Sequence, residues 1–155
     1  MKEVNGKIFV DGDSCPVVNE IVTIAKEKNI EVIFVTSYAH IRKKEFPPNV
    51  QSVFVDQDRE AADLKIANMI KRDDVAITDD LGLSSLLLAK EVQVLTSRGK
   101  LVTNDEIDYL LDSRYRSAKQ RRAGAKTKGP KKLTDQNRLD FKKQLEKILS
   151  NRQEF

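Results

Sequence analysis

The chain has 155 residues, of which 39% are hydrophobic and 34% charged, and its net charge is +4; these values are typical of one soluble domain with its own core. Its apolar runs are far shorter than a membrane span, and its first residues lack the apolar stretch of a signal peptide, so we expect a cytoplasmic protein. The single cysteine, Cys15, excludes an internal disulfide and agrees with a reducing compartment.

The first half of the chain alternates short apolar strands with helices. Apolar runs predict strands at 7–10, 32–35 and 52–55. Pro16 begins a helix with apolar residues at three- and four-residue spacing, and Asn29 ends it. Residues 61–70 also have helical composition, so the pattern of strand and helix repeats.

The same alternation continues to about residue 112. We expect strands at 75–77 and 92–95, a helix at 83–89, and a helix from the capping box at 103–106 through Leu111. All five strands are continuous apolar runs, which indicates helices on both faces of the sheet. The sequence therefore predicts a three-layer α/β/α domain over residues 1–112 with a mostly parallel five-stranded sheet.

A basic segment follows at residues 113–133. It contains nine of the 28 Lys and Arg residues and no Asp or Glu, which leaves 19 basic and 24 acidic residues elsewhere, a net charge of −5. Such a segment suits the phosphates of RNA, which release counterions on contact. A solvated flexible linker is the alternative, because Gly124, Gly129 and Pro130 break helices. The basic residues are Arg114, Arg116, Lys119, Arg121, Arg122, Lys126, Lys128, Lys131 and Lys132.

Residues 134–155 form the last predicted element. Thr134 is a helix cap, and Phe141, Leu145, Ile148 and Leu149 share one helical face. We expect this amphipathic helix to pack back on the domain.

Acidic residues follow three of the predicted strands. Right-handed crossovers place the carboxyl ends of parallel strands at one edge, so acids far apart in sequence should meet there. Carboxylates in such a cluster suit Mg²⁺ or Mn²⁺, which prefer oxygen ligands. Each acid taken alone could instead cap a helix, and only one of the neighbours Asp79 and Asp80 can point comfortably into the crevice. The three groups are Asp11 with Asp13, Glu60 with Asp63, and Asp79 with Asp80.

Three short motifs in this order resemble the YaiI/YqxD family: DGDSCP at 11–16, EAAD at 60–63 and ITDD at 77–80. The resemblance continues in Arg98-Gly99, Gly129-Pro130 and Arg138 with Phe141, and covers nearly the whole chain. It implies a fold like that of the PIN/NYN nucleases, which use acidic clusters to bind Mg²⁺ or Mn²⁺ and cut RNA. The metal-site acids that it implies are Asp11, Asp13, Asp63 and Asp80, with Glu60 beside them.

The resemblance also assigns roles within the cluster. Asp11, Asp63 and Asp80 are the expected catalytic residues, while Asp79 becomes secondary because the family pattern allows a small residue there. Arg98, just past the fifth strand, could bind a phosphate, although a surface salt bridge explains it equally well. Cys15 is best explained as a packed small side chain, and His40 as a surface residue.

Two other functions share these residues. An apolar strand ending in Asp11-Gly12-Asp13 also begins the haloacid-dehalogenase-like phosphatases, in which the first Asp is the nucleophile, and Thr36 and Lys65 are candidates for their other motifs. The basic segment on an inactive fold would instead give an RNA-binding or regulatory module. The metal-dependent ribonuclease remains the favoured hypothesis.

Overall fold

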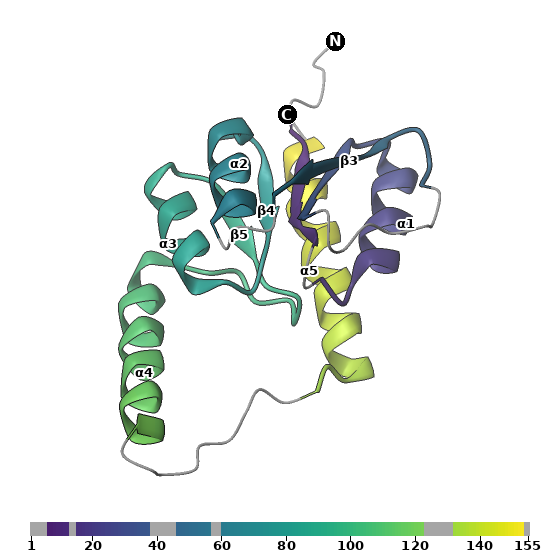
Figure 1. The fold of residues 1–155 in the computed structure, drawn as a ribbon. Helices are drawn as coiled ribbons and strands as arrows, with labels where there is room; N and C mark the ends of the chain where they lie inside the picture. Colours follow the sequence, from purple (N-terminus) through teal and green to yellow (C-terminus); the bar gives the residue numbers. More distant parts are fainter. Residues whose placement is uncertain (1–5, 13–14, 38–45, 57–59, 123–131, 154–155) are drawn as a thin grey trace.

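The computed structural model describes residues 6–12, 15–37, 46–56, 60–122 and 132–153. Among the described elements, strands and helices alternate along the chain except that β3 follows β2 and that two helices follow one another at the end (Figure 1). The elements are β1 (Ile8–Asp11), α1 (Val18–Lys28), β2 (Val32–Ser37), β3 (Val50–Val55), α2 (Ala61–Met69), β4 (Val75–Ile77), α3 (Leu81–Ala89), β5 (Gln93–Leu95), α4 (Asn104–Arg122) and α5 (Asp135–Gln153).

The five strands form one sheet in the order β3-β2-β1-β4-β5, and every neighbouring pair is parallel. The chain builds outward from β1 to β3 and then returns to the other side of β1 with β4. Between β1 and β4 the crossovers therefore change direction, and such a switch point leaves a crevice beyond the carboxyl ends of the strands. We call the side of the sheet at which the strands end the carboxyl edge.

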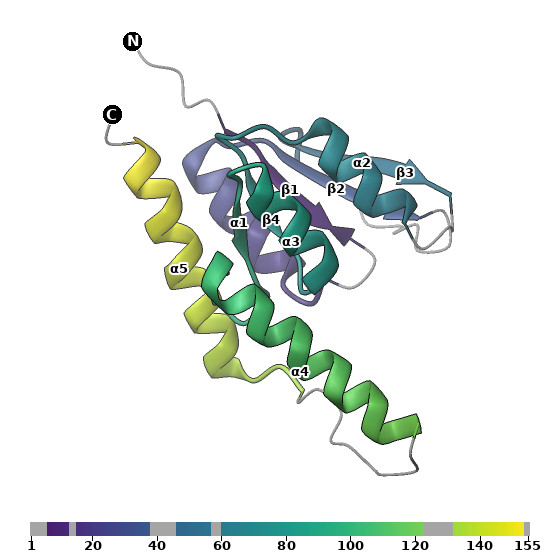
Figure 2. The ribbon, with the colours of Figure 1, turned by 90° about the vertical axis from the view of Figure 1, so that its left-hand side faces the viewer.

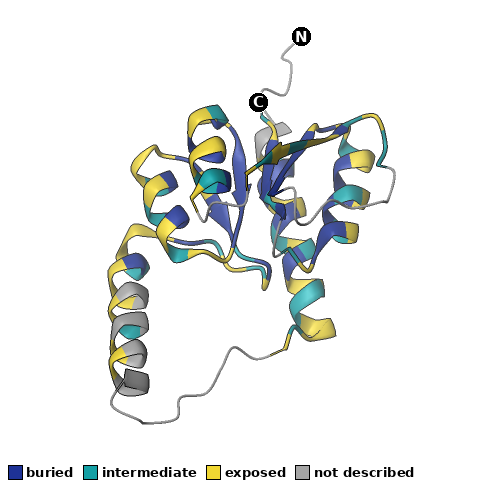
Figure 3. Cartoon of the chain, viewed as in Figure 1, coloured by how far each residue is buried: buried dark blue, intermediate teal, exposed yellow. Residues whose placement is uncertain are grey.

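Helices cover both faces of the sheet, as Figures 1 and 2 show: α1 and α5 lie on one face, and α2 and α3 on the other. Successive residues of β1 serve the two cores, since Ile8 and Val10 pack with α1 and α5 while Phe9 packs with α2 and α3. Figure 3 shows the buried residues concentrated in the sheet and on the helix surfaces that face it. The three-layer α/β/α prediction is confirmed.

The C-terminal helix also packs as predicted. Phe141 and Leu145 are fully buried in the core shared with α1. Its cap is reciprocal, because the Asn137 N–H donates to Thr134 Oγ1 at 3.0 Å and the Thr134 N–H donates to Asn137 Oδ1 at 3.0 Å. None of the helices within the described ranges has both the length and the apolar character needed to cross a membrane.

Two local predictions were wrong. β3 is an edge strand with exposed residues, including Phe54 at 38%, so it is not covered on both faces as its apolar sequence suggested. The helix expected to end at Leu111 continues to Arg122, where α4 ends. It continues because residues 112–122 contain no Gly or Pro and are rich in Arg, Lys and Gln, which favour helix.

Candidate functional site

Two of the predicted acids lie at the switch point itself. Asp11 is the last residue of β1, and Asp80 lies three residues beyond β4, the neighbour of β1 in the sheet. Asp13, which the sequence predicts beside them, lies outside the described residues. The topology therefore brings together two acids that are 69 positions apart in sequence, because β1 and β4 are neighbours in the sheet.

A threonine hydroxyl connects these two acids. Thr78 is buried, with 4% of its surface exposed. Its Oγ1 donates to Asp11 Oδ2 at 3.2 Å and accepts from the Asp80 N–H at 3.1 Å. Sequence reasoning passed over Thr78, although its place directly after a buried strand and before two acids is a signal that could have singled it out.

The neighbours Asp79 and Asp80 have different partners. Asp80 caps α3, because its Oδ1 accepts from the Leu83 N–H at 2.9 Å. Asp79 accepts two hydrogen bonds from Ser97, at 2.9 Å from its N–H and at 2.5 Å from its hydroxyl. The carboxylate of Asp79 thus holds the loop after β5, while that of Asp80 lies at the start of α3.

The remaining predicted acids come from the start of α2. Glu60 is the N-cap residue of this helix and Asp63 lies in its first turn. Burial and, in decreasing order of effect, the carboxylates of Asp80, Asp11 and Glu60 together raise the pKa of Asp63 from 3.8 to about 6. We call these four acids, Asp11, Glu60, Asp63 and Asp80, the acid cluster.

The acid cluster is an oxygen-only donor set of the kind that hard divalent cations prefer. Within the described part of the chain, however, no three His, Cys, Asp or Glu side chains are close enough together to hold a metal ion directly. Mg²⁺ keeps several water ligands and often uses one or two carboxylates. The described carboxylates therefore form no closed protein cage, and a cation at this place would take most of its ligands from water and substrate oxygens.

A small depression lies beside the cluster, on the side of β1 toward β5. It is lined by Asp11, Cys15, Pro16, Ile77, Thr78, Asp79 and Ser97. Cys15 is partly buried and packs against the α1 core, in agreement with its interpretation as a packing residue. The depression is therefore an opening onto Asp11 and Thr78.

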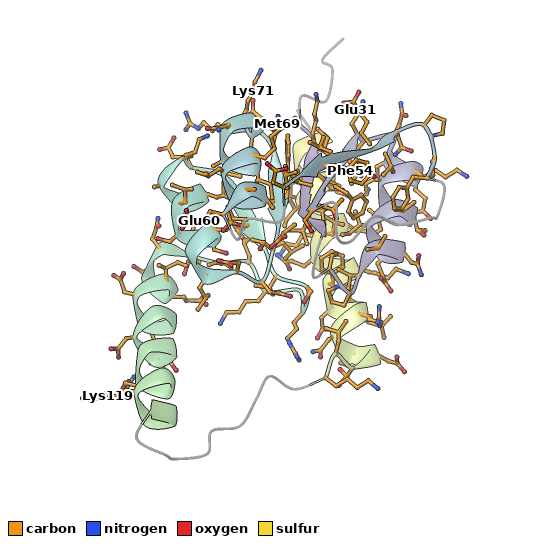
Figure 4. The ribbon with its side chains drawn as sticks, viewed as in Figure 1. Glu31, Phe54, Glu60, Met69, Lys71 and Lys119 are labelled. Carbon is orange, nitrogen blue, oxygen red and sulfur yellow. The ribbon has the colours of Figure 1, made fainter. Side chains whose placement is uncertain are left out.

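A larger cavity, of about 760 Å³, lies at the opposite edge of the sheet. Figure 4 shows Met69, Lys71 and Glu31, three of its lining residues, near that edge, and Glu60 at the other end of α2. No residue of the acid cluster lines this cavity, so the two features are separate.

The structure explains why the motif residues at 98–99 and 138–141 occur together. Arg98 donates to Asn137 Oδ1 at 3.0 Å, and Arg138 donates to Pro16 O at 2.9 Å and to Glu20 at 3.1 Å. Gly99 has φ +86, and a Cβ there would lie 2.6 Å from the Asp140 carbonyl carbon. These contacts dock the start of α5 beside the carboxyl edge, which gives Arg98 a structural partner in addition to any phosphate.

The predicted basic residues divide between α4 and the segment that follows it. Arg114, Arg116, Lys119, Arg121 and Arg122 belong to α4, whereas Lys126 and Lys128, like His40, lie outside the described residues. The side chains of Arg116 and Lys119 are exposed. Figure 4 shows Lys119 on the far part of α4, away from the sheet.

A family model and several related proteins match this chain over most of its length. The family model described as "Uncharacterized BCR, YaiI/YqxD family" matches residues 9–151. A UPF0178 protein of Bacillus pumilus is 47% identical over 148 residues, which cover 96% of this chain and 89% of the relative. A UPF0178 protein of Enterococcus faecalis is 49% identical over 139 residues (90% and 94%), and one of Listeria monocytogenes is 43% identical over 146 residues (94% and 97%). No solved structure matches the chain.

Proposed function

The chain belongs to the YaiI/YqxD family, and we propose that it is a metal-dependent ribonuclease that hydrolyses phosphodiester bonds at the carboxyl edge of its sheet. The observation that carries the proposal is the link that the buried Thr78 hydroxyl makes between Asp11, at the end of β1, and Asp80, beyond the neighbouring strand β4. In support, burial and the carboxylates of Asp80, Asp11 and Glu60 raise the pKa of Asp63. A fold that held these acids together only for its own stability would gain nothing from their mutual repulsion. The PIN/NYN-like relationship suggested by the sequence motifs is part of this proposal.

The cation is proposed to be Mg²⁺ or Mn²⁺, and the residues that would hold it are Asp11 and Asp80. Glu60 and Asp63, together with Asp13, would complete the site or orient its water molecules. When bound, such an ion polarises a phosphodiester oxygen and lowers the pKa of a bound water for attack on phosphorus.

Hydrogen bonds from neighbouring residues hold the acids in place. Thr78 orients the carboxylate of Asp11 through its hydroxyl and ties the backbone of Asp80 to it. The α3 cap restrains one oxygen of Asp80. Asp79 is a positioning residue in this scheme, because its two hydrogen bonds to Ser97 hold the loop after β5 next to the site.

The decisive experiment measures cleavage of mixed single-stranded and structured RNA with Mn²⁺ or Mg²⁺. We expect Asp11→Asn/Asp80→Asn to reduce the cleavage rate at least about 100-fold and to leave RNA affinity nearly unchanged, because loss of charge-stabilising groups acts on the transition state. The matched control is Asp56→Asn/Asp73→Asn, which removes two exposed carboxylates outside the cluster. Cleavage that survives the double substitution in the cluster would refute the proposal.

The same assay separates the other two functions. A phosphatase would release phosphate from small phosphomonoesters and trap beryllofluoride on Asp11. An RNA-binding module would bind RNA with a steep salt dependence and cleave nothing in Mn²⁺. Either result would replace the ribonuclease proposal.

A further inference from the structure

We call residues 113–122, the basic part of α4, the basic arm. None of the side chains that the structure describes in this arm belongs to the hydrophobic core. Ile107 is the last α4 residue found among the buried hydrophobic residues of the described chain, with 6% of its surface exposed. Within the arm, the described side chains of Arg116 and Lys119 are exposed and that of Ser113 is partly exposed. Core packing therefore does not account for the side chains that the structure describes in the arm.

The arm extends in the direction in which the strands run. Figures 1 and 2 both show α4 continuing past the carboxyl edge of the sheet. At a rise of 1.5 Å per residue, Arg114 to Arg122 lie roughly 10 to 22 Å beyond Ile107 along the helix. The arm thus lies at some distance from the acid cluster, but both are on the carboxyl-edge side of the molecule.

The charges of the arm and the rest of the chain are opposite. The arm contains five Arg or Lys and no acid, whereas the chain outside residues 113–122 has 23 basic and 24 acidic residues, a net charge of −1. A polyanion approaching the acid cluster is repelled by its carboxylates, so attraction has to come from elsewhere. Among the described side chains of the arm, Arg116 pairs with Asp112 just before the arm, at 3.0 Å. Both partners are more than half exposed, so this ion pair is worth little and a phosphate could replace it.

We propose that the basic arm is a second binding region for the phosphodiester backbone of a nucleic acid, which contacts phosphates several nucleotides away from the bond at the acid cluster. At a rise of 1.5 Å per residue, Arg114 to Arg122 span roughly 12 Å of helix, which is the length of roughly three to four nucleotides at 3.4 Å per nucleotide of a duplex strand. The arm therefore favours long substrates over short ones. The inference about substrate length rests on the proposed ribonuclease function, whereas binding by the arm does not.

The first test measures binding without cleavage. Fluorescence anisotropy gives the affinity of a 20-nucleotide single-stranded RNA for the full chain at several salt concentrations in EDTA. We expect Arg114→Gln/Arg116→Gln/Lys119→Gln to weaken binding by roughly an order of magnitude and to reduce the slope of log K against log salt by about 2, because each lost phosphate contact contributes about 0.7. Gln is chosen because it favours helix nearly as well as Arg and Lys.

The matched control, Lys26→Gln/Lys143→Gln/Lys147→Gln, removes the same charge from exposed positions of α1 and α5. It should change the affinity by less than about threefold and leave the slope nearly intact. Equal losses in both triple variants would mean that net charge alone attracts RNA, and an unchanged arm variant would mean that the arm does not bind it; both results overturn the proposal. A DNA strand of the same sequence should behave like the RNA, since the arm is proposed to contact phosphates and not the 2′-hydroxyl.

The second test compares cleavage of a dinucleotide and of the 20-nucleotide RNA. The arm variant should lose kcat/KM for the long substrate and retain it for the dinucleotide. An equal loss for both lengths would contradict the length dependence. If the wild type cleaves neither substrate, the ribonuclease proposal fails, while the anisotropy result still decides whether the arm binds.

Discussion

The acid cluster and the basic arm are built in opposite ways. The cluster consists of side chains from β1, α2 and the end of β4, held by a buried threonine and by a helix cap. The arm is one exposed stretch of helix whose only described ion pair is between Arg116 and Asp112. Groups that must keep a geometry are held by the core, whereas groups that attract a flexible polyanion need only charge and reach.

Substitution of Thr78, which holds the acid cluster, should have the largest effect on stability and cleavage. Thr78→Val removes the hydroxyl but keeps the shape, so Asp11 loses a donor and the Asp80 N–H loses an acceptor in a buried place. We expect the free energy of unfolding to fall by about 1–3 kcal/mol, as measured by urea denaturation, and RNA cleavage to fall with it. Thr78→Ser should restore most of both, and Thr23→Val, at an exposed position of α1, should change neither. A Thr78→Val protein as stable and as active as wild type would show that the hydroxyl does not organise the cluster.

The charge of Asp63 should make the stability of the fold depend on pH. Its pKa is about 6 in the folded protein against 3.8 for an ordinary Asp. The folded state therefore binds more protons between these values, and the stabilisation present below about pH 4 is lost as pH rises through 6. In Asp63→Asn the midpoint of thermal unfolding should be higher than in wild type at pH 8, and the difference should shrink toward pH 4.

The control for this measurement is Asp73→Asn, at an exposed position outside the cluster. Its midpoint should follow that of the wild type across the pH range. A midpoint difference between Asp63→Asn and wild type that does not vary from pH 4 to 8 would argue against repulsion within the cluster.

Substitutions in the arm should have the smallest effect on stability. Arg116→Gln/Lys119→Gln removes one exposed i,i+4 ion pair and no buried surface. We expect the free energy of unfolding to change by less than about 0.5 kcal/mol, as measured by urea denaturation, while RNA affinity falls. A fall of several kcal/mol in the free energy of unfolding would mean that the arm packs in the folded core. The arm would then not differ from the acid cluster in how it is held.

Much of the fold could be predicted from local patterns. The strands, the cap at Thr134 and the buried face with Phe141 depend on residues near one another in sequence, and the structure confirms them. The exposure of β3 could not be predicted, because an apolar run does not say whether a strand lies at the edge of a sheet. The end of α4 was placed too early because dense positive charge suggested a linker, although helix propensity favoured continuation to Arg122.

The sequence by itself determined which acids follow strands and where the positive charge is concentrated, since both are properties of the order of residues. Only the tertiary structure decided that β1 lies beside β4, because strand order depends on how helices pack across the whole sheet. That adjacency places Thr78 between Asp11 and Asp80, and the adjacency of β4 and β5 brings Asp79 to Ser97. The fold also raises the pKa of Asp63 through burial and through carboxylates of other elements, because electric fields act through space and not along the chain.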